Sequence, residues 1–211
     1  MKQSVPWILA ATALIAFLIS FQELQRVRGK LGELSKTADW QRQLISSKLR
    51  AVSSPIVIFG DSITARSNLP ESLCDHPVVN AGIGGAHTFQ LNDYAKEVVG
   101  EFKPWISVIA VGLNDARVNN QQFSQDYDSL LNSFHGPLIL VSITSARDVE
   151  TASFNRIIEK AAQYRSAPYV DVSNVKYGPD GVHPTAGGID EWVSSVATAI
   201  MGSCLKLSTM R

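Results

Sequence analysis

The sequence contains little cysteine, since Cys74 and Cys204 are the only two in 211 residues. Neither belongs to a CxxC pair or to the Cys and His spacing that closes a structural zinc site. Two thiols so far apart in sequence also make no disulfide framework. We therefore interpret them as two ordinary thiols that do not indicate a redox compartment, and we expect no metal.

An excess of charge of either sign is also lacking, because 19 Lys and Arg balance 19 Asp and Glu. The distribution is uneven: residues 1–50 hold eight Lys and Arg against three Asp and Glu, and residues 51–211 hold eleven against sixteen. Binding to nucleic acid requires clustered Lys and Arg. The mildly acidic main part of the chain therefore predicts no nucleic-acid partner.

Long hydrophobic runs are absent apart from residues 7–21, which carry no charge. At about 1.5 Å per residue this run reaches about 22 Å, short of a hydrocarbon core of about 30 Å. Bulky Leu18 and Phe21 stand where signal peptidase requires small residues. We therefore predict an N-terminal transmembrane anchor or uncleaved signal over residues 1–22, in a single-pass membrane protein.

The next segment, residues 23–50, has the apolar pattern of a helix. Five apolar residues alternate at spacings of three and four: Leu24, Val27, Leu31, Leu34 and Ala38. Two heptads are too few for a coiled coil, so we expect a solvated helical stalk, with a dimer zipper as the alternative and the oligomeric state open. The basic residues here would keep the globular part cytoplasmic, but the short N-terminal tail favours export, and we expect an extracytoplasmic domain.

From Pro55 onward, short apolar runs rich in Val and Ile alternate with longer amphipathic stretches. The runs predict strands at 56–59, 78–81, 106–111, 138–143 and 169–172. The amphipathic stretches predict helices near 87–102, 121–134, 150–165 and 186–201. Buried strands that are each followed by a helix are typical of a parallel sheet covered on both faces. We predict a three-layer α/β domain over residues 51–203, followed by a tail at 204–211.

Polar residues that follow the strands of such a sheet are candidates for chemistry. The first strand leads into residues 60–64 (GDSIT), which places Ser62 at a sharp turn into a helix. An exposed nucleophile is useful at such a turn, although a serine that caps the helix explains the pattern equally well. The segment is not the G-x-S-x-G elbow of α/β-hydrolases, because Thr64 stands at the position of the last glycine.

Two further turns offer groups that stabilise negative charge. Residues 80–86 form a glycine-rich turn after the second strand, but His87 stands where a dinucleotide-binding fingerprint requires glycine, so no such cofactor is expected. The backbone N–H of Gly85 remains a candidate oxyanion donor. The side chain of Asn114, in residues 112–115 after the third strand, can also donate to an oxyanion, with a helix cap or Asx-turn as the alternative.

An acid and a histidine lie three residues apart in one loop near the carboxyl end of the chain, at Asp180 and His183. This spacing lets the carboxylate accept the Nδ1–H and leaves Nε2 free to take a proton from a serine. We interpret the other histidines differently, with His76 and His135 as surface residues and His87 as a structural residue at the start of a helix.

Together these segments resemble the SGNH, or GDSL-like, hydrolase family over residues 55–201. The resemblance is carried by 60–63, Gly85, 112–115 and 180–184. It implies a flavodoxin-like parallel sheet of roughly five strands. It also implies five catalytic residues: Ser62 as nucleophile, His183 as base and then acid, Asp180 as the acid that holds the imidazole, and Gly85 and Asn114 as oxyanion donors beside the Ser62 N–H.

The resemblance implies a serine esterase that hydrolyses a carboxylic ester or thioester through an acyl-enzyme on Ser62, without metal or cofactor. The expected partners are a small-molecule, lipid or glycan ester and a membrane, through the N-terminal helix. One alternative is an acyltransferase that passes the acyl group to a glycan or lipid hydroxyl; another is a non-catalytic, membrane-tethered binding protein. Ala86 stands where many relatives carry a polar residue, so the acyl and alcohol parts of the substrate stay open.

Overall fold

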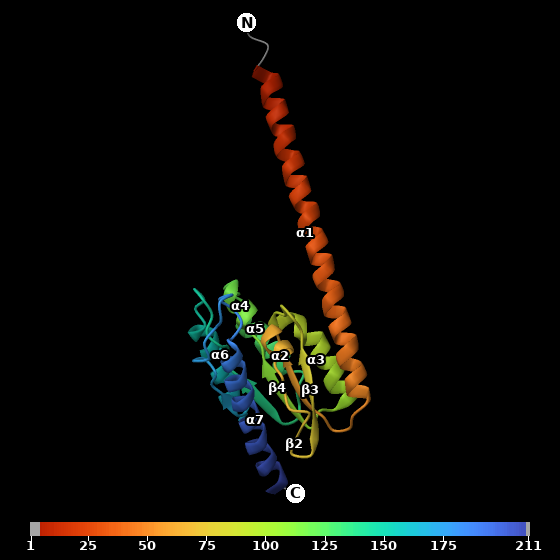
Figure 1. The fold of residues 1–211 in the computed structure, drawn as a ribbon, viewed down its shortest axis with the longest axis vertical. Helices are drawn as coiled ribbons and strands as arrows, with labels where there is room; N and C mark the ends of the chain where they lie inside the picture. Colours follow the sequence, from red (N-terminus) through yellow and green to blue (C-terminus); the bar gives the residue numbers. More distant parts are fainter. Residues whose placement is uncertain (1–4, 210–211) are drawn as a thin grey trace. The chain divides into compact units, whose positions relative to one another are not determined.

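The computed structural model describes residues 5–209, without the side chains of residues 5–9 and 30–35. The chain divides into two compact units, Met1–Gln41 and Arg42–Arg211, which we describe separately. Figure 1 shows the ribbon and the labels used below.

The described part of the first unit is one continuous helix, the amino-terminal part of α1 (Val5–Arg50). Pro6 lies in its first turn, where a missing N–H has no intrahelical partner to lose. The stretch predicted as a helical stalk is therefore helical. Several large apolar side chains along it are exposed, among them Phe17, Leu24 and Val27.

The predicted transmembrane anchor at residues 1–22 is wrong. Within residues 5–209, no helix has a stretch that is both long and apolar enough to cross a membrane, and residues 1–4 lie outside the described residues. The physical reason is length, since the uncharged run of about 22 Å falls short of about 30 Å of hydrocarbon. The same finding corrects the predicted single-pass localisation, the extracytoplasmic placement that depended on it, and the membrane as a partner.

The second unit is built on a six-stranded sheet in the order β2-β3-β1-β4-β5-β6. The strands are β1 (Ile56–Gly60), β2 (Ser72–Leu73), β3 (His76–Gly82), β4 (Ile106–Ala110), β5 (Leu138–Val141) and β6 (Tyr169–Val170). All neighbours are parallel except β2 and β3, which form an antiparallel hairpin at one edge. Strand order reverses beside β1, and sheets of this kind bind ligands beyond the carboxyl ends of the strands at such a point, here β1, β3 and β4.

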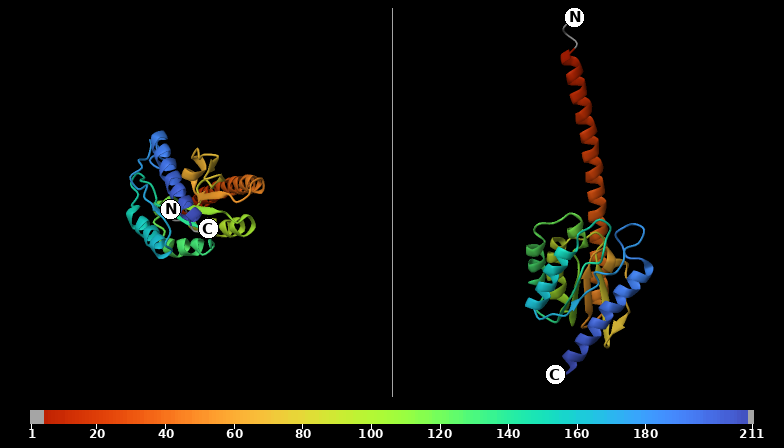
Figure 2. Two further views of the ribbon diagram at one scale, coloured as in Figure 1. Left: turned by 90° about the horizontal axis from the view of Figure 1, so that it is seen from below. Right: turned by 90° about the vertical axis from the view of Figure 1, so that its left-hand side faces the viewer.

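Helices lie on both sides of this sheet (Figure 2). The longer ones are α3 (Thr88–Phe102), α5 (Phe123–Leu131), α6 (Ala152–Tyr164) and α7 (Ala186–Thr209). Two short helices, α2 (Ser62–Arg66) and α4 (Leu113–Arg117), follow directly on β1 and β4. Helix α3 packs on α5 and α5 on α6, while α7 contacts β2, β5 and β6. Every residue of β1 and β4 is buried, as continuous apolar runs predict.

The predicted α/β class with a mostly parallel sheet is confirmed. The sequence predicted a turn into a helix at Ser62, but it gave no bounds for α2 or α4 and did not predict β2, because elements of two to five residues are too short to show a period. Helix α7 also runs on to Thr209 through the predicted tail, since Gly202 lies inside it without ending it.

The last turns of α1, from Arg42 onward, belong to the second unit. Ile45 and Leu49 are buried there. Arg42 donates from Nη2 to the carbonyl oxygen of Gln90 at 3.1 Å and lies over the ring of Tyr94, 5.5 Å from its centre. The second unit therefore begins before the boundary at residue 51 that the sequence suggested, and the remaining domain boundaries stay predictions.

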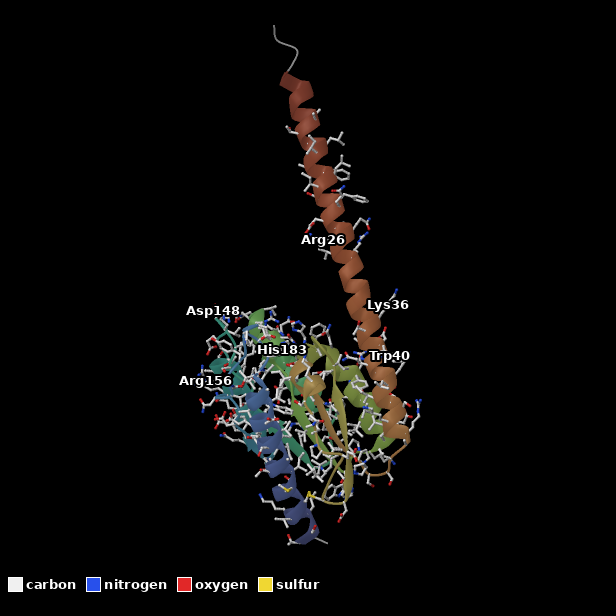
Figure 3. All side chains as sticks on the ribbon, viewed as in Figure 1. Arg26, Lys36, Trp40, Asp148, Arg156 and His183 are labelled. Atoms are coloured by element: carbon white, nitrogen blue, oxygen red, sulfur yellow. A yellow bond between two sulfur atoms is a disulfide. The ribbon has the colours of Figure 1, made fainter. Side chains whose placement is uncertain are left out.

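Cys74 and Cys204 form a disulfide bond, so their interpretation as ordinary thiols is wrong (Figure 3). Cys74 lies in the two-residue turn between β2 and β3, and Cys204 is buried on α7. The two residues are 130 positions apart. The fold brings them together because α7 packs against β2.

Candidate active site

Ser62 lies where β1 ends and α2 begins, at the carboxyl edge of the sheet. Asp61 caps this turn, because its Oδ1 accepts the backbone N–H of Ile63 at 2.9 Å. Gly82 lets α2 approach β3 closely, since a Cβ at this position would lie 2.3 Å from the backbone nitrogen of Ala65. Capping and close packing therefore fix the turn that carries Ser62.

Ser62 is joined to His183 by a hydrogen bond across 121 positions of sequence, with 2.9 Å between Oγ and Nε2. On the other side of the ring, Nδ1 of His183 lies 2.7 Å from Oδ2 of Asp180. A carboxylate only accepts, so Nδ1 carries the proton and Nε2 can accept the hydroxyl of the serine. The structure thus brings together three of the predicted residues in the order that a serine triad requires; His183 is labelled in Figure 3.

The loop around Asp180 keeps this carboxyl group in its charged form. Its Oδ1 accepts the backbone N–H groups of Val182 and His183, each at 2.9 Å. The Val182 N–H, followed by the His183 ring and the His183 N–H, holds the pKa of Asp180 well below its usual range. Asp180 is therefore a permanent acceptor for the imidazole.

Arg147, in the segment after β5, supports the same loop, and this role was not predicted from the sequence. Its backbone N–H donates to the oxygen of Gly181 at 2.7 Å, and its Nη2 donates to the oxygen of Pro179 at 3.1 Å. Its guanidinium lies 5.8 Å from the centre of the Tyr177 ring. Because two of these contacts are to backbone oxygens, they leave no trace in the pattern of side chains.

The two predicted oxyanion donors lie in neighbouring turns. Gly85 has a φ of 74°, which glycine adopts readily. The Ile83 N–H donates to the Gly60 oxygen at 2.9 Å, so the turn after β3 stays joined to the end of β1. Asn114, in α4, donates from Nδ2 to the oxygen of Ala86 at 3.0 Å. An amide nitrogen has two hydrogens, so Asn114 can also donate to a substrate.

A carboxylate to which the sequence assigned no role, that of Asp115, connects these turns. It is fully buried, and its Oδ2 accepts the Thr88 N–H at 3.0 Å and the Thr88 hydroxyl at 2.9 Å. Its Oδ1 accepts Nδ2 of Asn120 at 3.0 Å and lies 3.5 Å from Nδ1 of His87. Asp115 therefore holds the start of α3 against α4, and His87 takes part in this structural contact.

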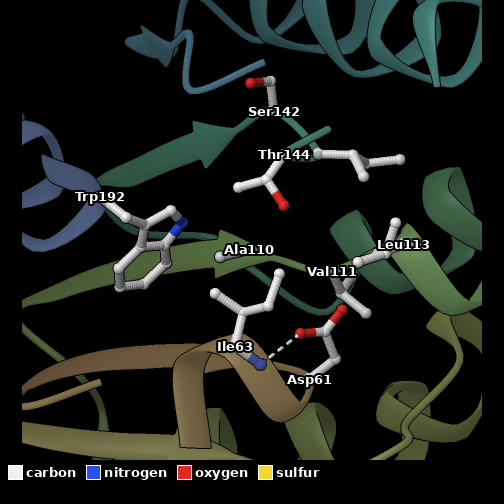
Figure 4. Close-up of a pocket in the computed structure, with 9 residues that line it drawn as sticks. Asp61, Ile63, Ala110, Val111, Leu113, Ser142, Thr144 and Trp192 are labelled. Atoms are coloured by element: carbon white, nitrogen blue, oxygen red, sulfur yellow. Dashed lines mark hydrogen bonds between the residues drawn. The ribbon is translucent and has the colours of Figure 1, made fainter. Parts of the chain in front are cut away.

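Asp61 and Ile63, the sequence neighbours of Ser62, line a small cavity of about 10 Å³ together with Thr144 (Figure 4). The Thr144 hydroxyl is buried and has no hydrogen-bond partner among residues 5–209. Burial raises the pKa of Asp61 to about 7, although the Ile63 N–H lowers it; the charge of Asp115 adds to the rise. Asp61 is thus a carboxyl group that gains a proton near neutral pH.

The remaining histidines that the sequence set aside lie elsewhere. His76 is at the amino end of β3, opposite the end that leads to Gly85, and stacks on Trp105 with ring centres 3.7 Å apart. His135 is exposed. In the described part of the chain, no group of three His, Cys, Asp or Glu side chains is placed to hold a metal ion.

The sequence matches the model of the GDSL-like lipase/acylhydrolase family over residues 58–190. No curated protein sequence matches the chain.

Solved structures share the fold. A GDSL-like lipase from Bacteroides thetaiotaomicron is 22% identical with a TM-score of 0.62, covering 79% of this chain and 98% of its own. A catalytic mutant of an acetylxylan esterase from Geobacillus stearothermophilus is 15% identical with a TM-score of 0.56, and the match covers 71% of this chain and 95% of the esterase. An aryl esterase from M. smegmatis is 14% identical with a TM-score of 0.57, and the match covers 71% of this chain and 99% of the aryl esterase.

Proposed function

Because the chain belongs to the GDSL-like lipase/acylhydrolase family, we propose that it cleaves carboxylic esters or thioesters through an acyl-enzyme on Ser62. One observation carries the proposal. Ser62 Oγ, both ring nitrogens of His183 and Asp180 Oδ2 form a hydrogen-bonded chain with distances of 2.9 and 2.7 Å. Such a chain supplies a nucleophile, a base and a group that orients the base.

In the acylation half of the reaction, Nε2 of His183 takes the hydroxyl proton while Oγ of Ser62 bonds to the carbonyl carbon of the substrate. The carbonyl electron pair moves onto oxygen, which accepts hydrogen bonds from the Ser62 N–H, the Gly85 N–H and the Asn114 amide. The imidazolium, stabilised by Asp180, then gives its proton to the leaving oxygen or sulfur as the bond from carbon to the leaving group breaks. The alcohol or thiol departs, and the acyl group stays on Ser62.

Water then completes the reaction, with water as the nucleophile and Ser62 as the leaving group. Nε2 takes one water proton as the water oxygen attacks the acyl carbon, and the oxyanion returns to the same donors. The proton passes to Oγ as the ester bond to Ser62 breaks, which releases the carboxylic acid. If a sugar or lipid hydroxyl attacked the acyl carbon in place of water, the acyl group would pass to that hydroxyl. The test therefore includes such acceptors.

The substrate class that we propose is a small-molecule, lipid or glycan ester. The fold is shared with an acetylxylan esterase and an aryl esterase, which supports a panel of acetylated oligosaccharides and aryl acetates. Graded p-nitrophenyl esters from acetate to palmitate extend the panel to lipid-like acyl chains.

The test combines turnover with covalent labelling of the full chain. We expect hydrolysis of at least one ester of the panel, labelling of Ser62 by a fluorophosphonate probe, and loss of both in Ser62→Ala. Free acid and acylated acceptor are quantified with and without a sugar or glycerol acceptor, which separates hydrolysis from transfer. Labelling of another serine, or full turnover by Ser62→Ala, would contradict the proposal.

A further inference from the structure

A second pocket, of about 540 Å³, lies beside the turns that carry the candidate oxyanion donors. It is lined by His87, Phe89, Val118, Asn120, Gln122 and Asp126. His87 is two residues beyond Gly85, and Val118 is four residues beyond Asn114. The hydrogen bond from Asn114 to Ala86 joins the two segments that lead into these lining residues. The pocket therefore lies next to the segments that carry Gly85 and Asn114, and its volume is within the range of about 300–1,000 Å³ of ligand pockets.

One wall of this pocket is apolar and flat. The Phe89 ring is 55% exposed and stacks on the His87 ring, with centres 5.9 Å apart and planes inclined by 29°. Val118, which is 66% exposed, extends the apolar surface. Covering an exposed phenylalanine face removes apolar surface from water, which favours binding. A flat ring surface favours a ligand that stacks on it.

The remaining lining is polar and largely fixed. Asn120 donates from Nδ2 to Asp126 at 2.9 Å, as it does to Asp115, and its Oδ1 accepts the Gln122 N–H at 2.9 Å. A carboxylate has more acceptor sites than this one bond uses, and Gln122 is exposed, so both can meet ligand hydroxyls. The backbone of His87 is also held in place, since its backbone N–H donates to Oε1 of Gln90 at 2.9 Å.

This mixture of side chains narrows the chemistry of the occupant. An alkyl chain would take water from Asp126 and Gln122 without replacing their hydrogen bonds, which is unfavourable. A phosphate or sulfate finds no Lys or Arg in the lining and meets the Asp126 carboxylate instead. A neutral ring with an apolar face and hydroxyl groups at its edge satisfies both walls.

We propose that the pocket formed by His87, Phe89, Val118 and Asp126 binds a sugar ring of the substrate, with the apolar face of the ring on Phe89. The inference rests on the proposed esterase function, because it makes the substrate a glycan ester. Phe89 does not touch the reacting atoms in this arrangement; it determines specificity.

The test separates sugar binding from catalysis. Free xylo-, manno- and chito-oligosaccharides are titrated into the full chain by calorimetry, and kcat and KM are measured on their acetylated forms and on p-nitrophenyl acetate. The variants are Phe89→Ala, the conservative Phe89→Trp, and Tyr164→Ala, which removes an aromatic ring that is 90% exposed at the end of α6.

We expect Phe89→Ala to weaken binding of at least one oligosaccharide about ten-fold and to raise KM for its acetylated form by the same factor. Phe89→Trp and Tyr164→Ala should stay near wild type on both kinds of ester, and Phe89→Ala should lose less on p-nitrophenyl acetate than on the acetylated oligosaccharide. No binding of any oligosaccharide at about 10 mM, equal losses on sugar and aryl esters, or selective loss of long-chain esters would overturn the proposal. If the wild type hydrolysed no ester, the esterase function would fail, while titration with free sugars would still decide the pocket.

Discussion

At the scale of single residues, the proposed roles of Ser62, His183 and Asp180 predict unequal losses of activity. Ser62→Ala and His183→Ala should each lower kcat/KM on the order of 10⁴-fold or more, because nucleophile and base act as a unit. Asp180→Asn should cost the same or less, since the carboxylate orients the ring and stabilises imidazolium without taking the proton. Turnover of one activated ester by the three purified variants measures this order.

The same residues predict how the rate depends on pH. The pKa of Asp180 is held well below its usual range by the Val182 N–H and the His183 ring, so Asp180 stays charged throughout an assay in mild acid. A fall of kcat/KM on acidification should therefore not arise from Asp180, and it should be absent from the residual rate of His183→Ala. If that variant kept most of its activity, or kept the acidic limb, another residue would be the base.

Asp61 predicts a pH dependence of stability rather than of rate. Burial raises its pKa from 3.8 to about 7 in the folded protein, so between about pH 4 and 7 the folded state holds a proton that the unfolded state has released. The free energy of unfolding should then fall as pH rises through this window, by at most about 1.4 kcal/mol per pH unit from this group. Below pH 4 both states are protonated and the effect vanishes.

Asp61→Asn isolates this contribution, because an asparagine can still cap α2 but does not titrate. Urea unfolding of both proteins at pH 4.5, 5.5, 6.5 and 7.5 should show the variant gaining stability over wild type as pH rises. Parallel curves for the two proteins would mean that Asp61 is already ionised at pH 4.5.

Only part of the candidate site could be predicted from residue patterns in the sequence. Asp180 and His183 share one tight loop, so their pairing was readable from spacing, and Ser62 was readable from its place after a strand. Asp115 was not, because its partner Thr88 is 27 positions away and their contact depends on the turn geometry of two separate loops. The role of Arg147 could not be predicted for a similar reason, since Arg147 binds backbone oxygens.

At the scale of elements, the end of α1 predicts where the chain can be shortened. Deleting residues 1–41 removes the first unit and leaves the second complete, whereas deleting residues 1–50 also removes Ile45 and Leu49, which are 6% and 1% exposed. Each buried side chain of this size contributes about 1.5–3 kcal/mol. The longer deletion should therefore be less stable by about 3–6 kcal/mol, as measured by urea unfolding.

A matched pair of substitutions in the full chain controls for the truncation. Leu49→Ala should cost about 2–5 kcal/mol, whereas Leu44→Ala, on the same helix but 46% exposed, should cost less than about 1 kcal/mol. Equal stability of the two deletions, together with a neutral Leu49→Ala, would show that the helix end does not support the sheet.

Elements with a clear period were predictable from the sequence, and the others were not. The five parallel strands and the helices α3, α5, α6 and α7 follow from apolar runs and amphipathic stretches of sufficient length. The hairpin strand β2 is two residues long and is defined by its partner β3. The anchor failed because an uncharged run of fifteen residues resembles a membrane segment without reaching its length.

At the scale of the whole molecule, the disulfide connects the edge hairpin of the sheet to the last helix. This bond could not be predicted from the sequence, because only the packing of α7 against β2 makes Cys74 and Cys204 neighbours. The bond closes a loop of 130 residues, and a cross-link of this span restricts the unfolded chain strongly. Its position is remote from the reaction, since the β2–β3 turn lies at the edge of the sheet opposite Ser62.

Breaking the bond should therefore lower stability without lowering activity. Reduction of the wild type, or Cys74→Ser in the half-buried turn, should reduce the free energy of unfolding by about 2–5 kcal/mol, while kcat/KM below the unfolding transition stays within about two-fold. Urea unfolding with and without dithiothreitol measures the first quantity, and Cys74→Ser serves as its own control because the reductant should no longer affect it. Alkylation of both cysteines in native, unreduced protein would show that the bond is absent. A reductant effect of equal size in Cys74→Ser would show that the loss of stability has another source.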